Sequence, residues 1–378
     1  MNLTLGMRYP FQRLSDTNAP YAEALMKAAR RVVESGWYLL GNETEALERE
    51  LAAFTGTNHA IGTANGLEAI RLIFRALIEL GRLRPGDSVL VPANTFIASV
   101  LPLTQLGLVV RLVDPDPATM SVSLSAMAQA ADADTRAVLA VHLYGYPAYD
   151  REGFDALRAK GIILVEDNAQ AIGAEVFDPV DEIWKRTGSL GLASAVSFYP
   201  AKNIGALGDA GAVATSDDEL ADTVRCLANY GGAVKYHYPL QGYNSRIDEM
   251  QAAFLRVKLP YAVRERERRE ATARAYDEAV SNPGVVLPPR QAGLRQAWHQ
   301  YVVRCVDRDR LARFLAGHGV ETMIHYPVPP HRQECYAGVF PERFPVADRL
   351  AGEVLSLPIA NVSSSEAREI ASFINSFE

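Results

Sequence analysis

The chain has 378 residues, of which 48% are hydrophobic and 22% are charged, and its formal net charge is −7. The length suggests two or three domains, and the composition is ordinary for a globular protein. The acidic balance, without a basic tail or patch, argues against nucleic acid or an anionic membrane as a partner. Residues 1–8 lack the apolar core of a signal peptide, and no run approaches the roughly 20 apolar residues of a membrane span.

The three cysteines, at positions 226, 305 and 335, are far apart in the chain. They form neither a disulfide framework nor the spacing of a metal site. We therefore expect a reducing, cytoplasmic environment and no bound metal.

Strand and helix signals alternate through the first 260 residues. A strand at residues 59–63 is predicted to lead through Ala64, Asn65 and Gly66 into a helix at 67–80. Such a junction leaves free backbone N–H groups at the helix start, where a phosphate binds readily, although an ordinary strand–helix turn looks the same. Further strands are predicted at residues 88–91, 109–113, 137–143, 162–165, 193–198 and 212–215, and helices at 21–35, 44–54, 94–106, 150–160, 218–230 and 249–258.

This alternation predicts an α/β fold, in which a mostly parallel sheet has helices on both faces. The first strand is not followed by a G-x-G-x-x-G motif, so a nicotinamide-binding Rossmann domain lacks its key feature. In open α/β sheets, the ligand crevice lies at the carboxyl ends of the strands. We therefore look for functional residues just after each strand.

Asp167 follows the apolar strand at residues 162–165. A carboxylate in such a position needs a cation or strong hydrogen-bond donors. A protonated pyridine nitrogen would serve, but the side chain could equally cap a helix over residues 168–173. The residues alone leave both interpretations open.

Lys202 lies just past the strand at residues 193–198, where Pro200 ends the strand and glycines follow at positions 205, 208 and 211. A lysine whose neighbours remove its water can lose its proton and attack a carbonyl group. Ser197, five residues earlier, could donate its hydroxyl group to a phosphate. Taken alone, an exposed loop lysine is the simpler interpretation.

A polar, aromatic loop without periodicity spans residues 231–242 and includes Lys235. Loops of this length are often functional. The composition changes near residue 255, and alternating charges mark a solvated helix at 260–280. We therefore divide the chain into a large domain (residues 1–255) and a small α+β domain (residues 256–378), with strands at 301–306 and 321–324, a proline-fixed loop at 325–331, and helices at 309–318, 346–355 and 363–377.

Six motifs, in order along nearly the whole chain, resemble the DegT/DnrJ/EryC1/StrS family of sugar aminotransferases, which has the aspartate aminotransferase (type I) fold. Each motif alone is weak, but six in the family's order are specific. They are TANGL at residues 63–67, PANTF at 92–96, VEDNAQ at 165–170, SFYPAKN at 197–203, GYNSRID at 242–248 and HYP at 325–327.

The resemblance implies that the protein binds pyridoxal 5′-phosphate. Lys202 would bind the cofactor covalently and carry the proton between the amino acid and the cofactor. Asp167 would hold the pyridinium nitrogen and keep the ring an electron sink. Gln170 would contact the ring hydroxyl, and Phe96 would stack on the ring.

The same resemblance implies a phosphate seat and a homodimer. The backbone at Ala64, Asn65 and Gly66 would hold the phosphate together with the Ser197 hydroxyl. Asn244 would reach that phosphate from the neighbouring subunit, so the two subunits would share their active sites. Positions that line the nucleotide-sugar side in related enzymes are matched by Tyr199, Lys235, His325 and Tyr326.

The implied reaction is transamination of a nucleotide-linked keto-6-deoxyhexose with L-glutamate as donor, in amino-sugar biosynthesis and with ping-pong kinetics. Gln170 stands where enzymes that aminate C4 often carry His, and the motifs resemble most closely enzymes that aminate C3 of a dTDP-linked sugar. A 4-keto nucleotide sugar is the alternative substrate. Two departures bear on the substrate entrance: the connection at residues 178–187 is longer and more charged than usual, and Tyr146 replaces a common Gln.

Two other functions use the same fold. Cofactor-dependent sugar dehydratases of this family carry His in place of the lysine, so Lys202 argues against that activity. A non-enzymatic regulator would keep the fold as a scaffold, and it would not need the set Asp167, Ser197, Lys202 and Asn244.

Overall fold

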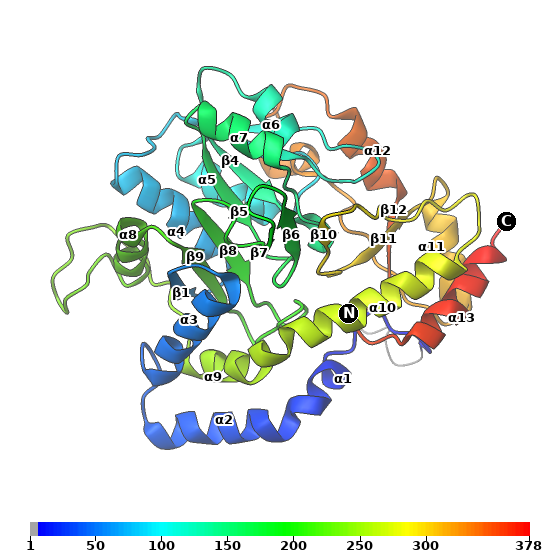
Figure 1. The fold of residues 1–378 in the computed structure, drawn as a ribbon, viewed down its shortest axis with the longest axis horizontal. Helices are drawn as coiled ribbons and strands as arrows, with labels where there is room; N and C mark the ends of the chain where they lie inside the picture. Colours follow the sequence, from blue (N-terminus) through cyan, green and yellow to red (C-terminus); the bar gives the residue numbers. More distant parts are fainter. Residues whose placement is uncertain (1–6) are drawn as a thin grey trace.

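The computed structural model describes residues 7–378, and a seven-stranded sheet lies at its centre (Figure 1). Its strands are β1 (His59–Thr63), β2 (Ser88–Pro92), β3 (Val109–Val113), β4 (Thr135–Val141), β5 (Ile163–Asp167), β8 (Ala193–Ser197) and β9 (Gly211–Thr215). The spatial order is β1-β9-β8-β5-β4-β2-β3. From β8 to β3 the neighbours are parallel, whereas β9 is antiparallel to both of its neighbours. The predicted mostly parallel sheet is confirmed.

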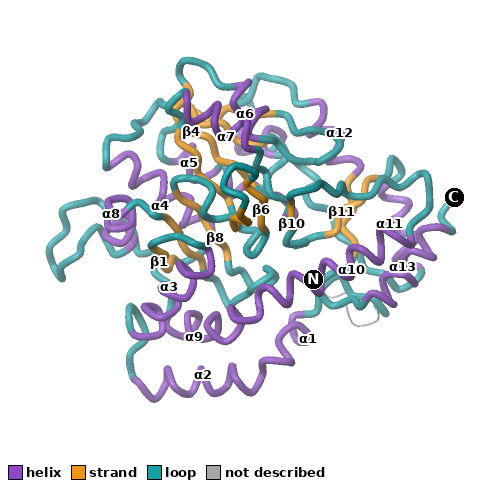
Figure 2. The backbone as a smooth tube through the Cα atoms, viewed as in Figure 1, coloured by secondary structure: helices purple, strands orange, loops and turns teal. Residues whose placement is uncertain are grey.

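Helices surround the sheet and make up most of the remaining regular structure (Figure 2). Among residues 7–378, none of them combines the length and the apolar character needed to cross a membrane. The α-helices are α1 (Leu14–Asn18), α2 (Ala22–Ser35), α3 (Asn42–Thr55), α4 (Gly66–Glu79), α5 (Leu101–Gln105), α6 (Leu124–Ala130), α7 (Arg151–Ala159), α8 (Asp218–Ala228), α9 (Glu249–Lys258), α10 (Ala262–Ala279), α11 (Arg308–Gly317), α12 (Pro345–Glu353) and α13 (Ser364–Asn375).

Both faces of the sheet are buried, because successive side chains of a strand point to opposite sides. Val89 and Val91 of β2, with Leu139 of β4, belong to the apolar cluster that includes α4 and α8. Leu90 and Val138, from the same two strands, belong instead to the cluster that includes α6 and α7. Helices therefore cover the two faces, as the strand–helix alternation predicts.

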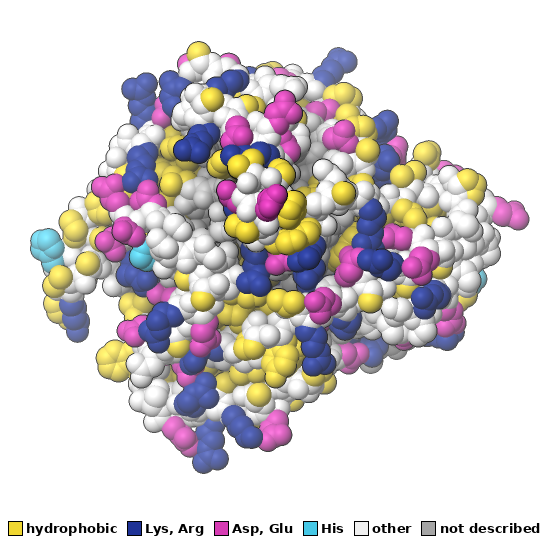
Figure 3. All heavy atoms as spheres, in the orientation of Figure 1, with side chains coloured by type: hydrophobic (Ala, Val, Ile, Leu, Met, Phe, Trp, Pro, Cys, Tyr) yellow, Lys and Arg dark blue, Asp and Glu magenta, His cyan; other side chains and the backbone are white. Residues whose placement is uncertain are grey.

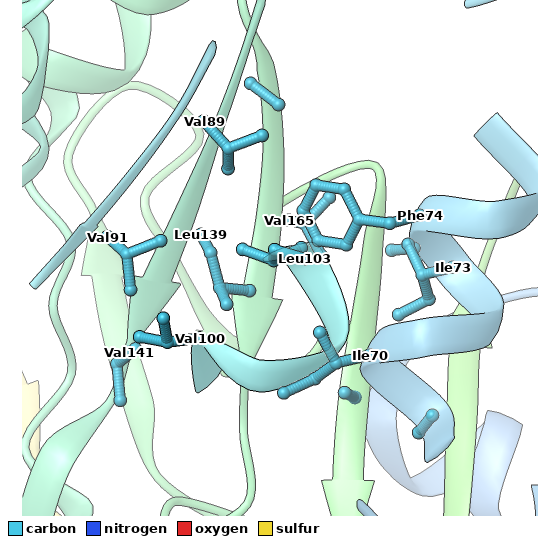
Figure 4. Close-up of a cluster of buried hydrophobic side chains, with 14 of the residues drawn as sticks. Ile70, Ile73, Phe74, Val89, Val91, Val100, Leu103, Leu139, Val141 and Val165 are labelled. Carbon is cyan, nitrogen blue, oxygen red and sulfur yellow. The ribbon is translucent and has the colours of Figure 1, made fainter. Parts of the chain in front are cut away.

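The packing of α4 against the sheet fixes one side of the candidate site (Figure 4). Ile70, Ile73 and Phe74 lie at helical spacing and are buried against strand residues such as Leu139 and Val165. The helix contacts both β8 and β9 along this side. Its first turn is thereby held at the ends of those two strands.

A second apolar cluster gathers the residues that follow α9. There α10 packs along α13, and β11 (Tyr301–Arg304) pairs antiparallel with β12 (Val354–Leu357). Tyr276, Trp298 and Tyr301 are fully buried in this cluster. The N-terminal segment joins the same unit, because Tyr9 belongs to the cluster and its N–H donates to the carbonyl of Gly319 at 2.9 Å.

The charged connection at residues 178–187 is a β-hairpin. β6 (Glu175–Asp178) pairs antiparallel with β7 (Ile183–Arg186), and β10 (Leu294–Arg295) pairs with the other edge of β6. The buried carboxylate of Asp178 accepts a hydrogen bond from Lys185 Nζ at 2.8 Å. Lys185 lowers the pKa of Asp178 to about 2. Charges that make this connection unusual in the sequence therefore pair within the hairpin.

Several predicted elements differ from the structure, because short apolar runs do not distinguish helix from strand. Residues 94–106 contain only short helical segments, at residues 97–99 and 101–105. Of the predicted strand at 321–324, only an isolated bridge between Met323 and Ser356 forms. The strand predicted at 137–143 ends at Val141, the helix predicted at 346–355 ends at Glu353, and α6, β6, β7, β10 and β12 were not predicted.

Candidate active site

Lys202 lies in a tight turn that follows β8. Its backbone N–H donates to the carbonyl of Tyr199 at 2.8 Å, and Ala206 N–H closes the turn on the carbonyl of Phe198 at 2.8 Å. Burial lowers the pKa of Lys202 to about 8, although the negative charge of Asp167 opposes this shift. Near neutral pH a much larger fraction of this amine is therefore uncharged than of an ordinary lysine, and an uncharged amine is a nucleophile.

Two side chains of α9 hold this turn in place. Lys258 Nζ donates to the carbonyl of Gly205 at 2.6 Å, and Gln251 Oε1 accepts the N–H of Leu207 at 2.9 Å. The two α9 residues are seven apart and therefore lie on the same face of the helix. Burial lowers the pKa of Lys258 to about 8, as it does for Lys202. The sequence contains no local signal for these contacts.

Asp167 ends β5, between β4 and β8, and its side chain is buried. Its Oδ2 accepts a hydrogen bond from the Ser99 hydroxyl at 2.7 Å, and its Oδ1 accepts the N–H of Ala169 at 3.1 Å. Because Ser99 donates its proton to Asp167, Thr95 is the donor in the 2.7 Å contact between the two hydroxyls. Residues 168–173 form turns, so the alternative that Asp167 caps a helix there is wrong.

Glu166, the preceding residue, is buried in a different network. It accepts a hydrogen bond from His142 Nε2 at 2.8 Å and backbone N–H groups from Gly188, Leu190 and Gly191 at 2.7–2.9 Å. These bonds tie the segment after the β6–β7 hairpin to β5. Sequence reasoning missed this anchor, because its partners become neighbours only in the folded chain.

The turn between β1 and α4 packs directly on Ser197. A Cβ atom on Gly66 would lie 2.7 Å from Ser197 Cβ, so only glycine permits this approach. Asn65 caps the helix by accepting the N–H of Glu68 at 2.9 Å. Within residues 7–378, the N–H of Gly66 and the Ser197 hydroxyl proton have no acceptor. These donors form a seat for an anion such as phosphate.

Gln170 joins the end of β5 to the loop that follows α11. Its Oε1 accepts the N–H of Tyr144 at 2.6 Å, and its Nε2 donates to the Tyr326 hydroxyl at 2.9 Å. The Tyr326 ring lies 5.1 Å from the ring of Phe96, which is 49% exposed. The structure thus brings together residues from three distant motifs, as expected.

Two imidazoles lie close enough to Lys202 for its charge to affect them. Burial lowers the pKa of His325 to about 4, and the charge of Lys202 adds to the shift. Burial also lowers the pKa of His299, with Lys202 as the next cause. Both rings are therefore neutral at pH 7. His325 Nδ1 lies 2.8 Å from Ser356 Oγ.

His299 was not predicted as a site residue. Its Nδ1 lies 3.1 Å from Oδ1 of Asn203, the residue after Lys202, and Asn203 Nδ2 donates to the carbonyl of Ala297 at 2.7 Å. A buried guanidinium, that of Arg269, donates to the carbonyls of Trp298 and His299 at 3.1 and 3.2 Å. The segment at residues 297–299 thereby links the lysine turn to α10.

Three predicted residues do not join this cluster within one chain. Tyr199 is 55% exposed, and Lys235 lies in the loop that extends away from the body of the molecule after α8 (Figure 1). Asn244 is exposed and its Oδ1 accepts a hydrogen bond from Arg246 Nη2 at 2.7 Å. These three side chains are available to a partner or a substrate.

Comparison with known proteins gives the same assignment as the motifs. Residues 21–375 match the model of the DegT/DnrJ/EryC1/StrS aminotransferase family. The dTDP-3-amino-3,6-dideoxy-alpha-D-galactopyranose transaminase of Aneurinibacillus thermoaerophilus is 42% identical over 95% of this chain and 96% of that protein. The erythromycin biosynthesis sensory transduction protein EryC1 of Saccharopolyspora erythraea is 43% identical over 96% of this chain and 97% of that protein.

A solved structure is also very similar. The crystal structure of S. venezuelae DesV in complex with a ketimine intermediate superposes with a TM-score of 0.91 at 38% identity. The match covers 98% of each chain.

Proposed function

Because the chain belongs to the DegT/DnrJ/EryC1/StrS aminotransferase family, we propose that it transfers an amino group from L-glutamate to C3 of a dTDP-linked 3-keto-6-deoxyhexose. The cofactor is pyridoxal 5′-phosphate. The observation that carries the proposal is that Lys202 lies near Asp167, while the Gly66–Ser197 anion seat lies at the end of β8, the parallel neighbour of β5, which Asp167 ends. The name of the 42% identical transaminase supports a 3-amino sugar nucleotide.

The residues of the crevice fit pyridoxal phosphate. The unpaired donors at Gly66 and Ser197 match its phosphate, and the buried carboxylate of Asp167 matches its protonated ring nitrogen. When bound, the cofactor supplies an electron sink for the carbanion chemistry of transamination. Phe96 and Gln170 are assigned to the ring, Phe96 as a stacking partner and Gln170 beside the ring hydroxyl.

Lys202 holds the catalytic proton in this proposal. Its lowered pKa would let Nζ hold the cofactor and would make it a base of suitable strength near neutral pH. The tight turn and its support from Lys258 and Gln251 limit the motion of Nζ. Neutral His299 and His325 avoid placing a second positive charge beside the lysine, which would work against proton uptake.

We assign Asp167 to pair with the protonated ring nitrogen of the cofactor. Ser99 and Ala169 orient its carboxylate, and Thr95 orients Ser99 in turn. Two donors fix the direction of this buried carboxylate. Because its donors hold the Asp167 carboxylate rigidly, the carboxylate needs little reorientation when charge develops in the reaction.

The nucleotide sugar is assigned to the side of the crevice that carries Tyr326 and His325. The Tyr326 hydroxyl accepts from Gln170, and within residues 7–378 its own proton has no acceptor. It can therefore donate a hydrogen bond to the hexose. Tyr199 is exposed beside the lysine turn, and Lys235, when brought near by a second subunit, suits a phosphate of the nucleotide.

We propose a homodimer whose subunits share their active sites. Large apolar side chains are exposed over α2 and the turn that follows it, and on the projecting loop at residues 231–242 (Figure 3). An isolated bridge between Leu39 and Asp248 joins this surface to the segment that holds Asn244. The exposed apolar residues are Met26, Val33, Trp37, Tyr38, Leu39, Leu40, Val234, Tyr236 and Tyr238.

Mixing two inactive variants tests the shared site. Lys202→Ala subunits lack the nucleophile, and Asn244→Ala subunits lack the group assigned to the phosphate of the partner. A mixed dimer contains one site without both groups and one intact site. Random mixing should therefore restore about a quarter of wild-type activity, measured after the exchange of subunits. If mixed dimers form without any activity, Asn244 acts in its own chain or has no role.

Product analysis tests the substrate and the position of amination. The holoenzyme is supplied with L-glutamate and either the 3-keto or the 4-keto dTDP-6-deoxyhexose, and the product is examined by NMR. A sugar anchored by its nucleotide presents one carbonyl within the roughly 3–3.5 Å of a near-attack geometry. We expect the amine at C3. An amine at C4 alone would overturn the choice of substrate and leave the aminotransferase activity standing, and UDP- and GDP-linked sugars test the nucleotide.

A regulatory function is the second candidate, because one 43% identical relative is named a sensory transduction protein. The lowered pKa of Lys202 and the hydrogen-bonded carboxylate of Asp167 favour the enzyme. A scaffold gains nothing from a buried amine near a buried carboxylate. A dehydratase is disfavoured because Lys202 occupies the position where those enzymes carry His.

We also propose that the large domain spans residues 1–255 and the small domain residues 256–378. The apolar cluster around α10 supports this division, while the cluster around α4 also takes in Val302, Tyr336, Leu350 and Val354 of the small domain. The N-terminal segment at Tyr9 crosses to the small domain's cluster. The three free cysteines support the proposed cytoplasmic, reducing environment.

A further inference from the structure

A cleft lined mainly by arginines lies between α10 and the strand β10. Its volume is about 300 Å³, and its charged walls are Arg266, Glu270, Arg274, Arg290 and Arg295. Figure 3 shows Lys and Arg side chains gathered on the face where β10 lies beside α10. None of these residues was assigned a role in catalysis, and none is bonded to Lys202 or Asp167.

Arg266 is the residue that calls for an explanation. Its side chain is only 12% exposed, and its nearest carboxylate, Glu267, lies 3.9 Å away and is itself 65% exposed. Among residues 7–378, the guanidinium of Arg266 makes no hydrogen bond, although it carries five N–H donors. The residue is only partly buried and none of its nitrogens is fully shielded from solvent, so a bound anion can replace water as their hydrogen-bond partner.

Each of the other three arginines of the cleft is paired with a carboxylate. Glu270 Oε1 is bonded to both Arg274 and Arg290, at 3.0 and 2.6 Å, and Arg290 also binds Asp277 at 2.6 Å. Arg295 pairs with Glu175 at 2.8 Å and lies over the ring of Trp184. Those three guanidinium groups are thus positioned by the fold, whereas Arg266, among residues 7–378, has only the distant ion pair with Glu267 and no hydrogen bond.

We propose that this cleft is a binding site for a compound with two linked phosphate groups, separate from the cofactor and sugar sites. The fixed forks of several arginines match phosphate oxygens better than lysines would, because each guanidinium can bind in a bidentate way. The volume admits a diphosphate together with its bound water molecules. Gln296 and Gln291 add neutral donors to the lining.

The side chain of Trp298 links the cleft to the candidate active site, and the Tyr146 hydroxyl, which donates to Gln291 of the lining, gives a second link. Trp298 Nε1 donates to Glu270 at 2.6 Å, and Arg290 lies 4.7 Å above the Trp298 ring. The next residue, His299, contacts Asn203 beside the lysine. A diphosphate that competes with Glu270 for Arg290 therefore acts on the segment that supports the lysine turn.

Inorganic pyrophosphate is the probe, added to the holoenzyme so that the cofactor already fills its own phosphate seat. Isothermal titration compares the wild type with Arg266→Gln and with Arg264→Gln, an exposed arginine of α10 that does not line the cleft. We expect Arg266→Gln to weaken one class of pyrophosphate site by about tenfold to a hundredfold, the loss expected for a charge-assisted hydrogen-bonded pair. Arg264→Gln should bind as the wild type does.

The melting temperature without ligand gives an independent readout. Removing a poorly partnered buried charge should leave Arg266→Gln as stable as the wild type or more stable. Pyrophosphate should raise the melting temperature of the wild type and of Arg264→Gln more than that of Arg266→Gln. Equal affinity in all three proteins, or binding that disappears only when the sugar site is occupied by dTDP, would overturn the proposal. Failure of the wild type to bind pyrophosphate would overturn it as well.

Discussion

Replacement of Lys202 by alanine is expected to abolish transamination and to leave the fold and the dimer intact. The rate should fall by about 10⁴-fold or more, because both the nucleophile and the proton carrier are lost. Within residues 7–378 Nζ of Lys202 makes no hydrogen bond, so its removal leaves no described buried partner unpaired. Circular dichroism and the melting temperature should therefore stay close to those of the wild type.

The chemical test of the same assignment is borohydride reduction of the holoenzyme followed by peptide mapping. Lys258 is the matched control, because burial lowers its pKa to about 8 as well. Its Nζ donates a hydrogen bond to the carbonyl of Gly205, in the backbone of the lysine turn. We expect the label on Lys202 in both the wild type and Lys258→Met. A label on Lys258, or on any other lysine, would show that the assignment is wrong.

Asp167→Asn is expected to have the second-largest effect. Asparagine has nearly the same shape and can still accept the hydrogen bond from Ser99, but it carries no charge. Breaking a buried charge pair costs about 3–5 kcal/mol, which corresponds to a rate lower by about 10²- to 10⁴-fold. Steady-state kinetics with the amino donor measures the loss, and it should appear in kcat more than in KM.

Asp178→Asn separates this effect from the general effect of losing a buried carboxylate. Asp178 is as buried as Asp167, and Lys185 and Arg151 pair with it in the β6–β7 hairpin. We expect this variant to lose stability, since Lys185 lowers the pKa of Asp178 to about 2, and to keep its kcat. Comparable losses of kcat in the two variants would mean that Asp167 supports the fold and does not act on the cofactor.

The sheet and the order of the motifs could be predicted from the residues because their signals are local. Each buried strand is a short apolar run, and each is bounded by a proline, a glycine or an acidic residue within the sequence itself. Lys202 and Asp167 lie just after such runs. The predicted strands therefore place both residues at the carboxyl edge of the sheet. The phosphate seat at Gly66 followed in the same way from a strand that leads into a helix.

Only the tertiary structure decided what surrounds these groups. Ser99 contacts Asp167 across 68 residues of sequence, and Lys258 contacts Gly205 across 53. Such pairs depend on how separate elements pack. No local sequence pattern around either partner indicates the contact. The charges at residues 178–187 show the same limit, since the sequence marks the stretch only as long and charged, and the hairpin that pairs Lys185 with the buried Asp178 was not predicted.

The sequence likewise could not show that Arg266 makes no hydrogen bond among residues 7–378. Alternating charges at residues 260–280 predicted a solvated helix, and much of α10 is exposed. Whether one arginine of that run meets a carboxylate depends on which face of α10 lies against β10. The sequence by itself determined which functional groups the chain carries, because those groups lie just after the predicted strands. The packing of distant elements determined which charged groups are paired and which are left free to bind.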